Sequence, residues 1–211
     1  LLHLHSPLHY IIAMAIAMGV AFVLTWLFGF KDEKQEEVQN ETVENGERVE
    51  EKEDLVNEKT NADMKVYAPI RGEVIPMSEV EDPTFAAEVL GKGAAIRPAE
   101  GKVTAPFDGQ VSMVFDTKHA IGLLGDNGVE LLIHVGLDTV SLNGSAFKMH
   151  VANGDRIKKG QLLLEFDMEK IQAAGLKTTT PVIVSNTMAY TDVIKAAEGN
   201  CSCGDVLLEI K

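Results

Sequence analysis

The chain has 211 residues, of which 45% are hydrophobic, and its formal net charge is −13 at pH 7. This length provides one compact domain of ordinary size plus additional sequence. The acidic balance argues against nucleic acid as a partner, because binding to a phosphate backbone requires clustered Lys and Arg.

The first predicted element is a transmembrane helix over residues 10–30. This stretch contains no charged residue, and a helix of its length crosses a hydrocarbon core of roughly 30 Å. Trp26 lies near its C-terminal end, where aromatic side chains favour the membrane interface, and Lys31 and Lys34 follow, which favours a cytoplasmic exit. Because the chain opens within hydrophobic sequence and without Met, we expect it to be a piece of a longer protein. A buried helix of a soluble core is the alternative.

Residues 31–63 have the composition of a flexible acidic linker. They contain 13 acidic and 5 basic residues, a net charge of −8, and no aromatic residue. Such a segment cannot bury enough apolar surface to offset the entropy of ordering, and its like charges repel one another. We therefore expect it to tether residues 64–211 near the membrane.

Residues 64–211 form the predicted folded domain, and their pattern is all-β. Short runs rich in Val, Ile, Leu and Phe alternate with Gly, Pro, Asp and Asn, which is typical of sandwiches and barrels. The expected strands cover residues 65–70, 73–77, 94–98, 110–115, 121–124, 129–135, 161–166, 182–185 and 206–210. One short helix is expected over residues 168–174.

Two internal repeats predict a duplicated β-sandwich or barrel. The sequence APIRGEV at residues 68–74 recurs as APFDGQV at 105–111, and GQLLLEF at 160–166 recurs as GDVLLEI at 204–210. Repetition of this kind indicates two similar halves that pack together.

The candidate site lies around two histidines in the most apolar stretch of the domain. If residues 121–124 and 129–135 are antiparallel strands joined by a turn at 125–128, residue 119 lies opposite residue 134 and their side chains share one face. Two neighbouring imidazoles disfavour double protonation, which keeps one ring neutral and nucleophilic near pH 7. Such a pair suits phosphoryl carriage or metal binding, whereas a lone histidine on an apolar strand is more often structural.

Neighbouring polar groups provide hydrogen-bond partners for both rings. The Thr117 hydroxyl, two residues before His119, is placed to orient that ring, and the Gly136 carbonyl is placed to accept a ring proton from His134. Alternation also predicts that Leu132 shares the face of His134.

The sequence closely resembles the glucose-type enzyme IIA domains of the bacterial phosphoenolpyruvate-dependent sugar phosphotransferase system. The most specific element is GVELLIHVGLDTV at residues 128–140, and TKH at 117–119 resembles the segment around the family's second histidine. The resemblance covers nearly all of residues 64–211 and implies the family's duplicated hybrid motif fold.

The resemblance also implies roles for individual residues. His134 would take a phosphoryl group from the histidine phosphocarrier protein and pass it to a cysteine of a IIB domain, which makes the domain a phosphotransferase without a cofactor. His119 would support the transfer without being phosphorylated. The implied partner-binding residues are an apolar rim (Phe85, Phe115, Leu132 and Val140) and two acidic positions (Asp82 and Asp138). Gly122 departs from the family, which often has an aromatic residue there.

The upstream segment resembles the end of a IIC membrane domain in permeases of the β-glucoside, sucrose or trehalose type. This implies that residues 1–30 belong to a IIC domain in the cell membrane, with the IIA domain on its cytoplasmic side. Cys201 and Cys203 do not resemble the IIB nucleophile. They are too close together for a structural disulfide and too few for a zinc site, so we interpret them as ordinary turn or strand residues.

Three alternative functions are weighed against this one. A zinc peptidase of similar duplicated fold needs a His-x-His pair, but residue 136 is Gly. A biotinyl or lipoyl domain needs a lysine at a hairpin tip, which Lys170 does not match. A purely regulatory phosphoprotein module would use the same residues as a phosphoryl carrier, but the membrane tether argues against it. His150 has no matching motif and is expected to be a surface strand residue. No metal site is expected in the domain.

Overall fold

The computed structural model describes residues 64–211, and this part of the chain is a β domain with short helices. The predicted transmembrane helix at residues 10–30 and the predicted linker at 31–63 lie outside the described residues. Within residues 64–211, none of the helices combines the length and the apolar character needed to cross a bilayer.

The strands divide into two halves, one inserted into the other along the chain. The inner half, residues 102–166, is continuous in sequence and contains β4 (Lys102–Thr104), β5 (Gly109–Val114), β6 (Ala120–Gly125), β7 (Glu130–His134), β8 (Phe147–Met149), β9 (Arg156–Ile157) and β10 (Leu162–Phe166). The outer half, residues 64–98 and 180–210, contains β1 (Met64–Tyr67), β2 (Gly72–Pro76), β3 (Lys92–Pro98), β11 (Thr180–Val184), β12 (Val193–Lys195), β13 (Gly199–Cys201) and β14 (Val206–Ile210).

Short helices connect several of these strands. They are the 3-10 helices η2 (Met77–Glu79), η3 (Thr139–Leu142) and η4 (Thr187–Ala189), and the α-helices α3 (Pro83–Ala86) and α4 (Met168–Ala173).

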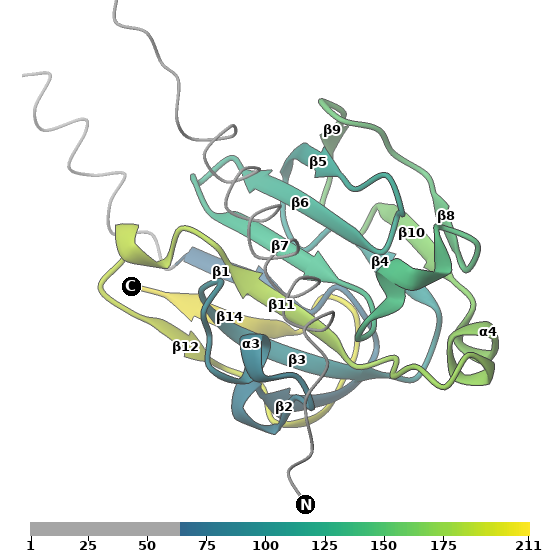
Figure 1. Ribbon diagram of the computed structural model, residues 1–211. Coiled ribbons are helices and arrows are strands. Elements are labelled where there is room, and N and C mark those ends of the chain that lie inside the picture. Colours follow the sequence, from purple (N-terminus) through teal and green to yellow (C-terminus); the bar gives the residue numbers. More distant parts are fainter. Residues whose placement is uncertain (1–63) are drawn as a thin grey trace, which may run out of the picture. The chain divides into compact units, whose positions relative to one another are not determined.

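The strand order repeats between the two halves (Figure 1). An eight-stranded sheet has the order β13-β2-β3-β11-β7-β6-β5-β9, in which the outer half supplies the first four strands and the inner half the last four. Each half adds a three-stranded sheet, β1-β14-β12 in the outer half and β4-β10-β8 in the inner half. The predicted duplication is therefore present in the strand order as well as in the sequence.

The sequence repeats make the same hydrogen bonds in both halves. The Ala68 amide donates to the carbonyl of Asp205 at 2.7 Å, and its carbonyl accepts from Gly204 at 3.0 Å. In the other half, the Ala105 amide donates to Gln161 and its carbonyl accepts from Gly160, both at 2.8 Å. Both glycines have positive φ, +92° at Gly204 and +82° at Gly160. This backbone conformation favours glycine and explains why it recurs in each repeat.

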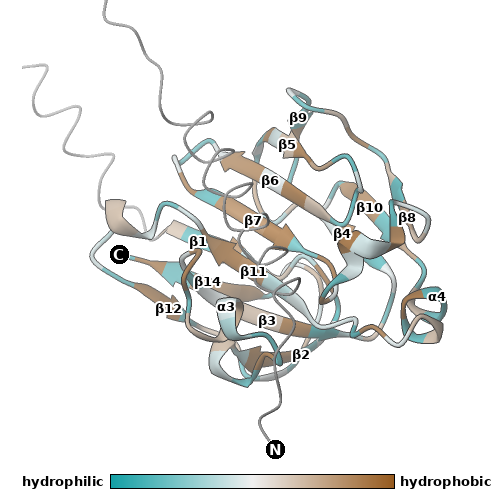
Figure 2. Cartoon of the chain, in the orientation of Figure 1, coloured by the Kyte–Doolittle hydropathy of each residue, from teal (hydrophilic) through white to brown (hydrophobic). Residues whose placement is uncertain are grey.

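Alternation along the strands buries one face of the large sheet in the main core. On β7, Leu131 and Ile133 belong to this core, and both are at most 1% exposed. Leu132, between them, points to the other face and packs on a second, smaller apolar cluster that contains Phe85, Leu137 and Ile183. Figure 2 shows hydrophobic residues concentrated on β6, β7 and β11, as this two-sided burial requires.

The expected strands and the expected helix are all present. β14 has the expected bounds, and the other elements have shifted ends. The sequence pattern does not predict β4, β8, β9, β12 and β13, because strands of two or three residues show too little alternation. It also does not predict α3, which is only four residues long.

Candidate functional site

His134 is the last residue of β7 and is half-buried at the edge of the second apolar cluster. Its ring centroid lies 5.0 Å from that of Phe85, with 59° between the ring planes. Phe85 is contributed by α3, in the connection between β2 and β3. The outer half of the domain therefore supplies the ring that packs against a histidine of the inner half.

His119 immediately precedes β6 and is only 7% exposed. It follows a tight turn in which the Lys118 amide donates to the Phe115 carbonyl at 2.7 Å. The φ of Lys118 is 57°, which turns the backbone out of the extended conformation. The ring centroids of His119 and His134 are 4.7 Å apart, with 78° between the ring planes, and the Phe115 ring is 5.5 Å from that of His119. The structure thus brings the two histidines together.

The predicted register between the two strands is wrong by one residue. His134 pairs with Ala120, not with His119, and the Val135 amide donates to the carbonyl of His119 at 2.8 Å. The reason is the turn: Gly125 donates to Val129 at 2.8 Å, so the turn is one residue shorter than expected. His119 still reaches His134, because it lies before the regular strand, directly after the left-handed Lys118.

Each histidine ring has a hydrogen-bond partner on Nδ1. The Oγ1 atom of Thr117 lies 2.6 Å from Nδ1 of His119. Nδ1 of His134 lies 2.8 Å from the carbonyl oxygen of Gly136. A carbonyl oxygen only accepts, so Nδ1 of His134 must carry a proton. In the neutral ring, Nε2 then keeps its lone pair.

The surroundings favour the neutral form of both rings. Burial, and secondarily the neighbouring His134, lower the pKa of His119 to about 4. Burial also lowers the pKa of His134, although the Gly136 carbonyl, Asp82 and Asp138 oppose this effect. Near pH 7 both imidazoles are therefore uncharged, and Nε2 of His134 is available as a nucleophile.

Asp82 has a structural role that the sequence analysis does not predict. It is the N-cap of α3, and its Oδ1 accepts from the Thr84 amide at 2.8 Å and from the Phe85 amide at 3.1 Å. The backbone of Phe85 is thus held directly by Asp82. The carboxylate therefore acts on His134 through its charge and through the position of the Phe85 ring.

The remaining predicted residues come from β7 and from the segment that follows it. Leu132 is partly buried two residues before His134, and Val140, on η3, is 50% exposed. Asp138 precedes η3 and has a positive φ of 58°. Gly122 pairs with Leu132, so β6 contributes no side chain to the rim at that position.

Other candidate residues lie in different parts of the domain. Cys201 is buried in β13 and Cys203 is exposed, and both are free thiols. His150 follows β8 at the surface, where Nε2 is 2.7 Å from a carboxylate oxygen of Glu165. Lys170 lies within α4 rather than at a hairpin tip. Within residues 64–211, His, Cys, Asp and Glu side chains form no group of three that could hold a metal ion.

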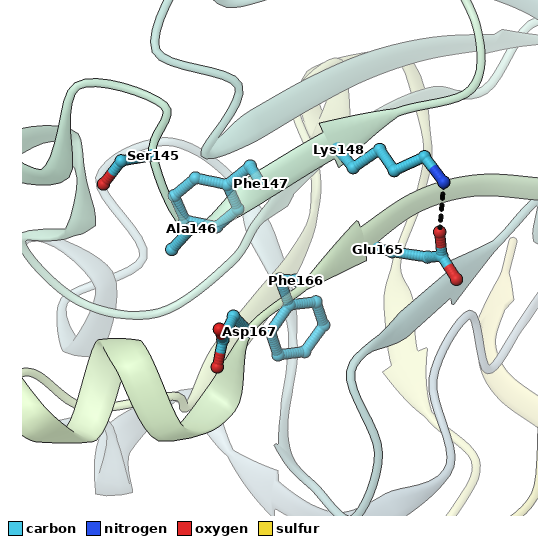
Figure 3. A pocket seen from close by; sticks show the side chains of 7 residues that line it. All are labelled: Ser145, Ala146, Phe147, Lys148, Glu165, Phe166 and Asp167. Carbon is cyan, nitrogen blue, oxygen red and sulfur yellow. Dashed lines mark ion pairs between the residues drawn. The ribbon is translucent and has the colours of Figure 1, made fainter.

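A surface hollow of about 320 Å³ is lined by residues of the paired strands β8 and β10 and of the segments next to them, and not by the histidine pair. In Figure 3 the rings of Phe147 and Phe166 lie in this hollow, and Lys148 reaches Glu165, with 3.3 Å between Nζ and the carboxylate oxygen. The hollow is wide open and belongs to the three-stranded sheet of the inner half. We do not assign it to the chemistry of the histidines.

Comparison with known proteins identifies relatives of the domain. Residues 64–190 match the family described as phosphoenolpyruvate-dependent sugar phosphotransferase system, EIIA 1. Among solved structures, the chain is similar to glucose permease IIA from Mycoplasma capricolum, with 35% sequence identity and a TM-score of 0.65. This match covers 72% of the present chain and 97% of the solved chain.

Proposed function

Because the chain belongs to the EIIA 1 family of the phosphoenolpyruvate-dependent sugar phosphotransferase system, we propose that His134 carries the phosphoryl group relayed by this system. The hydrogen bond from Nδ1 of His134 to the Gly136 carbonyl carries the proposal. It leaves an uncharged Nε2 with a free lone pair at the edge of an apolar cluster, which is the requirement for attack on phosphorus.

The relay consists of two displacements at phosphorus. First, Nε2 of His134 attacks the phosphoryl group of a phosphohistidine on the histidine phosphocarrier protein. A new P–N bond forms, the donor P–N bond breaks, and the donor ring leaves with the electron pair of the broken bond. Second, a cysteine thiolate of a IIB domain attacks the same phosphorus, so that a P–S bond forms and His134 regains its lone pair. The Nδ1 proton stays on His134 in both steps.

His119 supports the transfer without accepting the phosphoryl group. When the Thr117 hydroxyl donates to Nδ1 of His119, the ring proton resides on Nε2. That N–H then donates to a phosphoryl oxygen on the neighbouring ring, whose centroid is 4.7 Å away. Thr117 therefore decides which nitrogen of His119 faces the phosphoryl group as a donor.

Two further groups of residues act on partners. Phe85, Phe115, Leu132 and Val140 form the apolar rim that excludes water from the phosphohistidine and packs on flat partner surfaces. Asp82 and Asp138 attract a basic donor. The same two carboxylates repel a phosphoryl dianion on His134, which favours its onward transfer.

Residues 1–63 connect this carrier to its membrane partner within the proposal. We propose that residues 10–30 belong to the end of a IIC domain, and that residues 31–63 let the carrier domain move between its donor and its acceptor on the cytoplasmic side. A permease of this arrangement transports and phosphorylates a β-glucoside, sucrose or trehalose.

The test is phosphorylation of the 211-residue chain with phosphoenolpyruvate, enzyme I and the histidine phosphocarrier protein, followed by intact mass and site mapping. We expect one acid-labile phosphoryl group on His134, and none on a His134→Gln variant. His150→Gln is the matched control, because this exposed histidine follows β8, a strand of a different sheet, and the variant should be labelled like the parent. Absence of label on the folded parent would refute the carrier function.

A further inference from the structure

Thr139 is a buried polar residue that the relay described above does not use. Its side chain is 0% exposed. It follows Asp138, whose φ of 58° is a left-handed conformation that is strained for a non-glycine residue. This turn brings Thr139 back against residues 135 and 136. A strained turn beside a reactive group is a reason to ask what the turn holds in place.

Both branches of the Thr139 side chain contact the segment that follows His134. Oγ1 donates to the carbonyl oxygen of Val135 at 2.5 Å. Cγ2 lies so close to Gly136 that a Cβ atom added there would collide with it. The peptide group between residues 135 and 136 is therefore fixed by a hydrogen bond and by a steric contact.

The next peptide group contains the carbonyl that accepts the His134 proton. Its N–H belongs to Leu137 and donates to the backbone carbonyl of Lys177 at 3.0 Å. Gly136, with φ of +77°, joins the two peptide groups, and a Cβ on it would also lie 2.7 Å from the Lys177 carbonyl oxygen. The direction of the Gly136 carbonyl thus depends on Thr139 on one side and on Lys177 on the other.

We propose that Thr139 is a positioning residue that aims the Gly136 carbonyl at Nδ1 of His134 and thereby keeps Nε2 free of a proton. This inference rests on the proposed role of His134 as the phosphoryl acceptor. Without the Thr139 hydroxyl, the peptide groups after His134 can rotate, and the ring proton can move to Nε2. In that tautomer the nitrogen facing the phosphoryl donor has no lone pair.

The outer half of the domain contains a matched control for this hydrogen bond. Oγ1 of Thr187 donates to the carbonyl of Val184 at 2.5 Å, directly after β11. Val184 ends its strand as His134 ends β7, but it carries no titratable group. Replacement of Thr187 therefore removes the same kind of contact at a strand end, together with the hydrogen bond that Thr187 accepts from the Lys92 amide, without affecting an imidazole.

The experiment compares Thr139→Val, Thr139→Ser and Thr187→Val in the full 211-residue chain. Nitrogen NMR of ¹⁵N-labelled imidazoles, assigned with His134→Gln, reports which nitrogen of His134 carries the proton. For Thr139→Val we expect a shift towards the Nε2–H form and about fivefold slower phosphoryl acceptance, the effect of one hydrogen bond. Thr139→Ser should keep the parent's Nδ1–H form and should accept the phosphoryl group within about twofold of the parent rate, because it keeps the hydroxyl. Thr187→Val should change neither.

The outcomes separate this inference from the proposed function. An unchanged His134 spectrum in Thr139→Val would overturn the positioning role, even if the variant were less stable. Failure of the parent to accept a phosphoryl group would refute the carrier function, while the NMR comparison would still decide the role of Thr139. If Thr139→Val does not fold, Thr139→Cys takes its place, because its thiol is a weaker donor and should give an intermediate shift. An unchanged spectrum in that variant would also overturn the positioning role.

Discussion

The two halves of the domain end equivalent strands in different ways. In the inner half, β7 ends at His134, which pairs with Ala120 at the start of β6. In the outer half, β11 ends at Val184, which pairs in the same way with Lys92 at the start of β3. One strand end presents an imidazole to a second imidazole, whereas the other presents a valine that is 0% exposed.

The segments around these two strand ends also differ in the groups that they place there. In the outer half, the Lys92 amide donates to Thr187 at 3.0 Å and its Nζ forms an ion pair with Asp192 at 2.8 Å. These contacts pair the polar groups at this strand end with one another, and no imidazole is present there. Since both halves form the same strand order, the histidines are not needed to specify the fold. Within the proposed function, they form a site added to one copy of a duplicated scaffold, while the other copy supplies Phe85, whose ring packs against His134.

The largest effect should come from removing the second imidazole of the inner half. We expect His119→Gln to accept the phosphoryl group but to pass it to a IIB domain about 10³-fold more slowly, because its flexible amide does not hold a donor where the imidazole N–H stabilises the transferring group. Chase of labelled protein with an isolated IIB domain measures this rate. Lys92→Gln, at the matching strand end of the outer half, is the control and should transfer at the parent rate. Equal transfer rates for His119→Gln and the parent would contradict the proposed role of His119.

Acid should destabilise the domain through the histidine-bearing half. The pKa of His119 is lowered from 6.5 to about 4, so the unfolded chain binds a proton in this range that the folded chain does not. Above pH 6.5 the neutral His119 ring does not lower the free energy of unfolding. As the pH falls from 6.5 towards 4, the free energy of unfolding decreases by at most about 3 kcal/mol. Urea unfolding at a series of pH values measures this slope. His119→Gln should have a clearly shallower slope, and an identical slope would show that His119 is not held neutral.

A smaller effect should separate the two roles of Asp82, which the outer half contributes to the site. Asp82→Ala removes the N-cap of α3 and should cost about 1 kcal/mol of stability, with a few-fold slower phosphoryl acceptance as Phe85 loses its position. Asp82→Asn keeps an oxygen that can accept from the same amides but removes the charge. Urea unfolding should place Asp82→Asn close to the parent, because the cap remains. Its acceptance rate should lie between those of the parent and Asp82→Ala, because one of the two charges that attract the donor is lost. If Asp82→Asn is as slow as Asp82→Ala, the charge of Asp82 matters more than the cap.

Much of the strand framework is predictable because its long strands alternate regularly. Residues 130–134 alternate between the main core and the second cluster, and the two internal repeats predict the duplication. The very short strands are not predictable, because their pairing depends on neighbours distant in sequence. The start of α3 has a recognisable signal in Asp82-Pro83, an N-cap followed by proline.

The sequence predicts which residues belong to the candidate site better than it predicts how these residues are arranged. The motif around His134 and the short turn before β7 indicate that the two histidines meet, but the register depends on a turn that is one residue shorter than expected. Thr139 and Lys177 carry no signal of their role. Their effect depends on a contact between Leu137 and Lys177, which are 40 residues apart in sequence, and on the left-handed turn at Asp138.

The pairing of β1 with β14 has a mechanical consequence. Met64 lies opposite Ile210, so the two ends of the described chain meet in one ladder of the outer half. Tension applied through residues before Met64 therefore loads this ladder first, and the continuous inner half with its histidines is not on the direct path of the force. Joining the two ends would close the domain into a ring without interrupting that half, which makes it a natural unit for circular permutation.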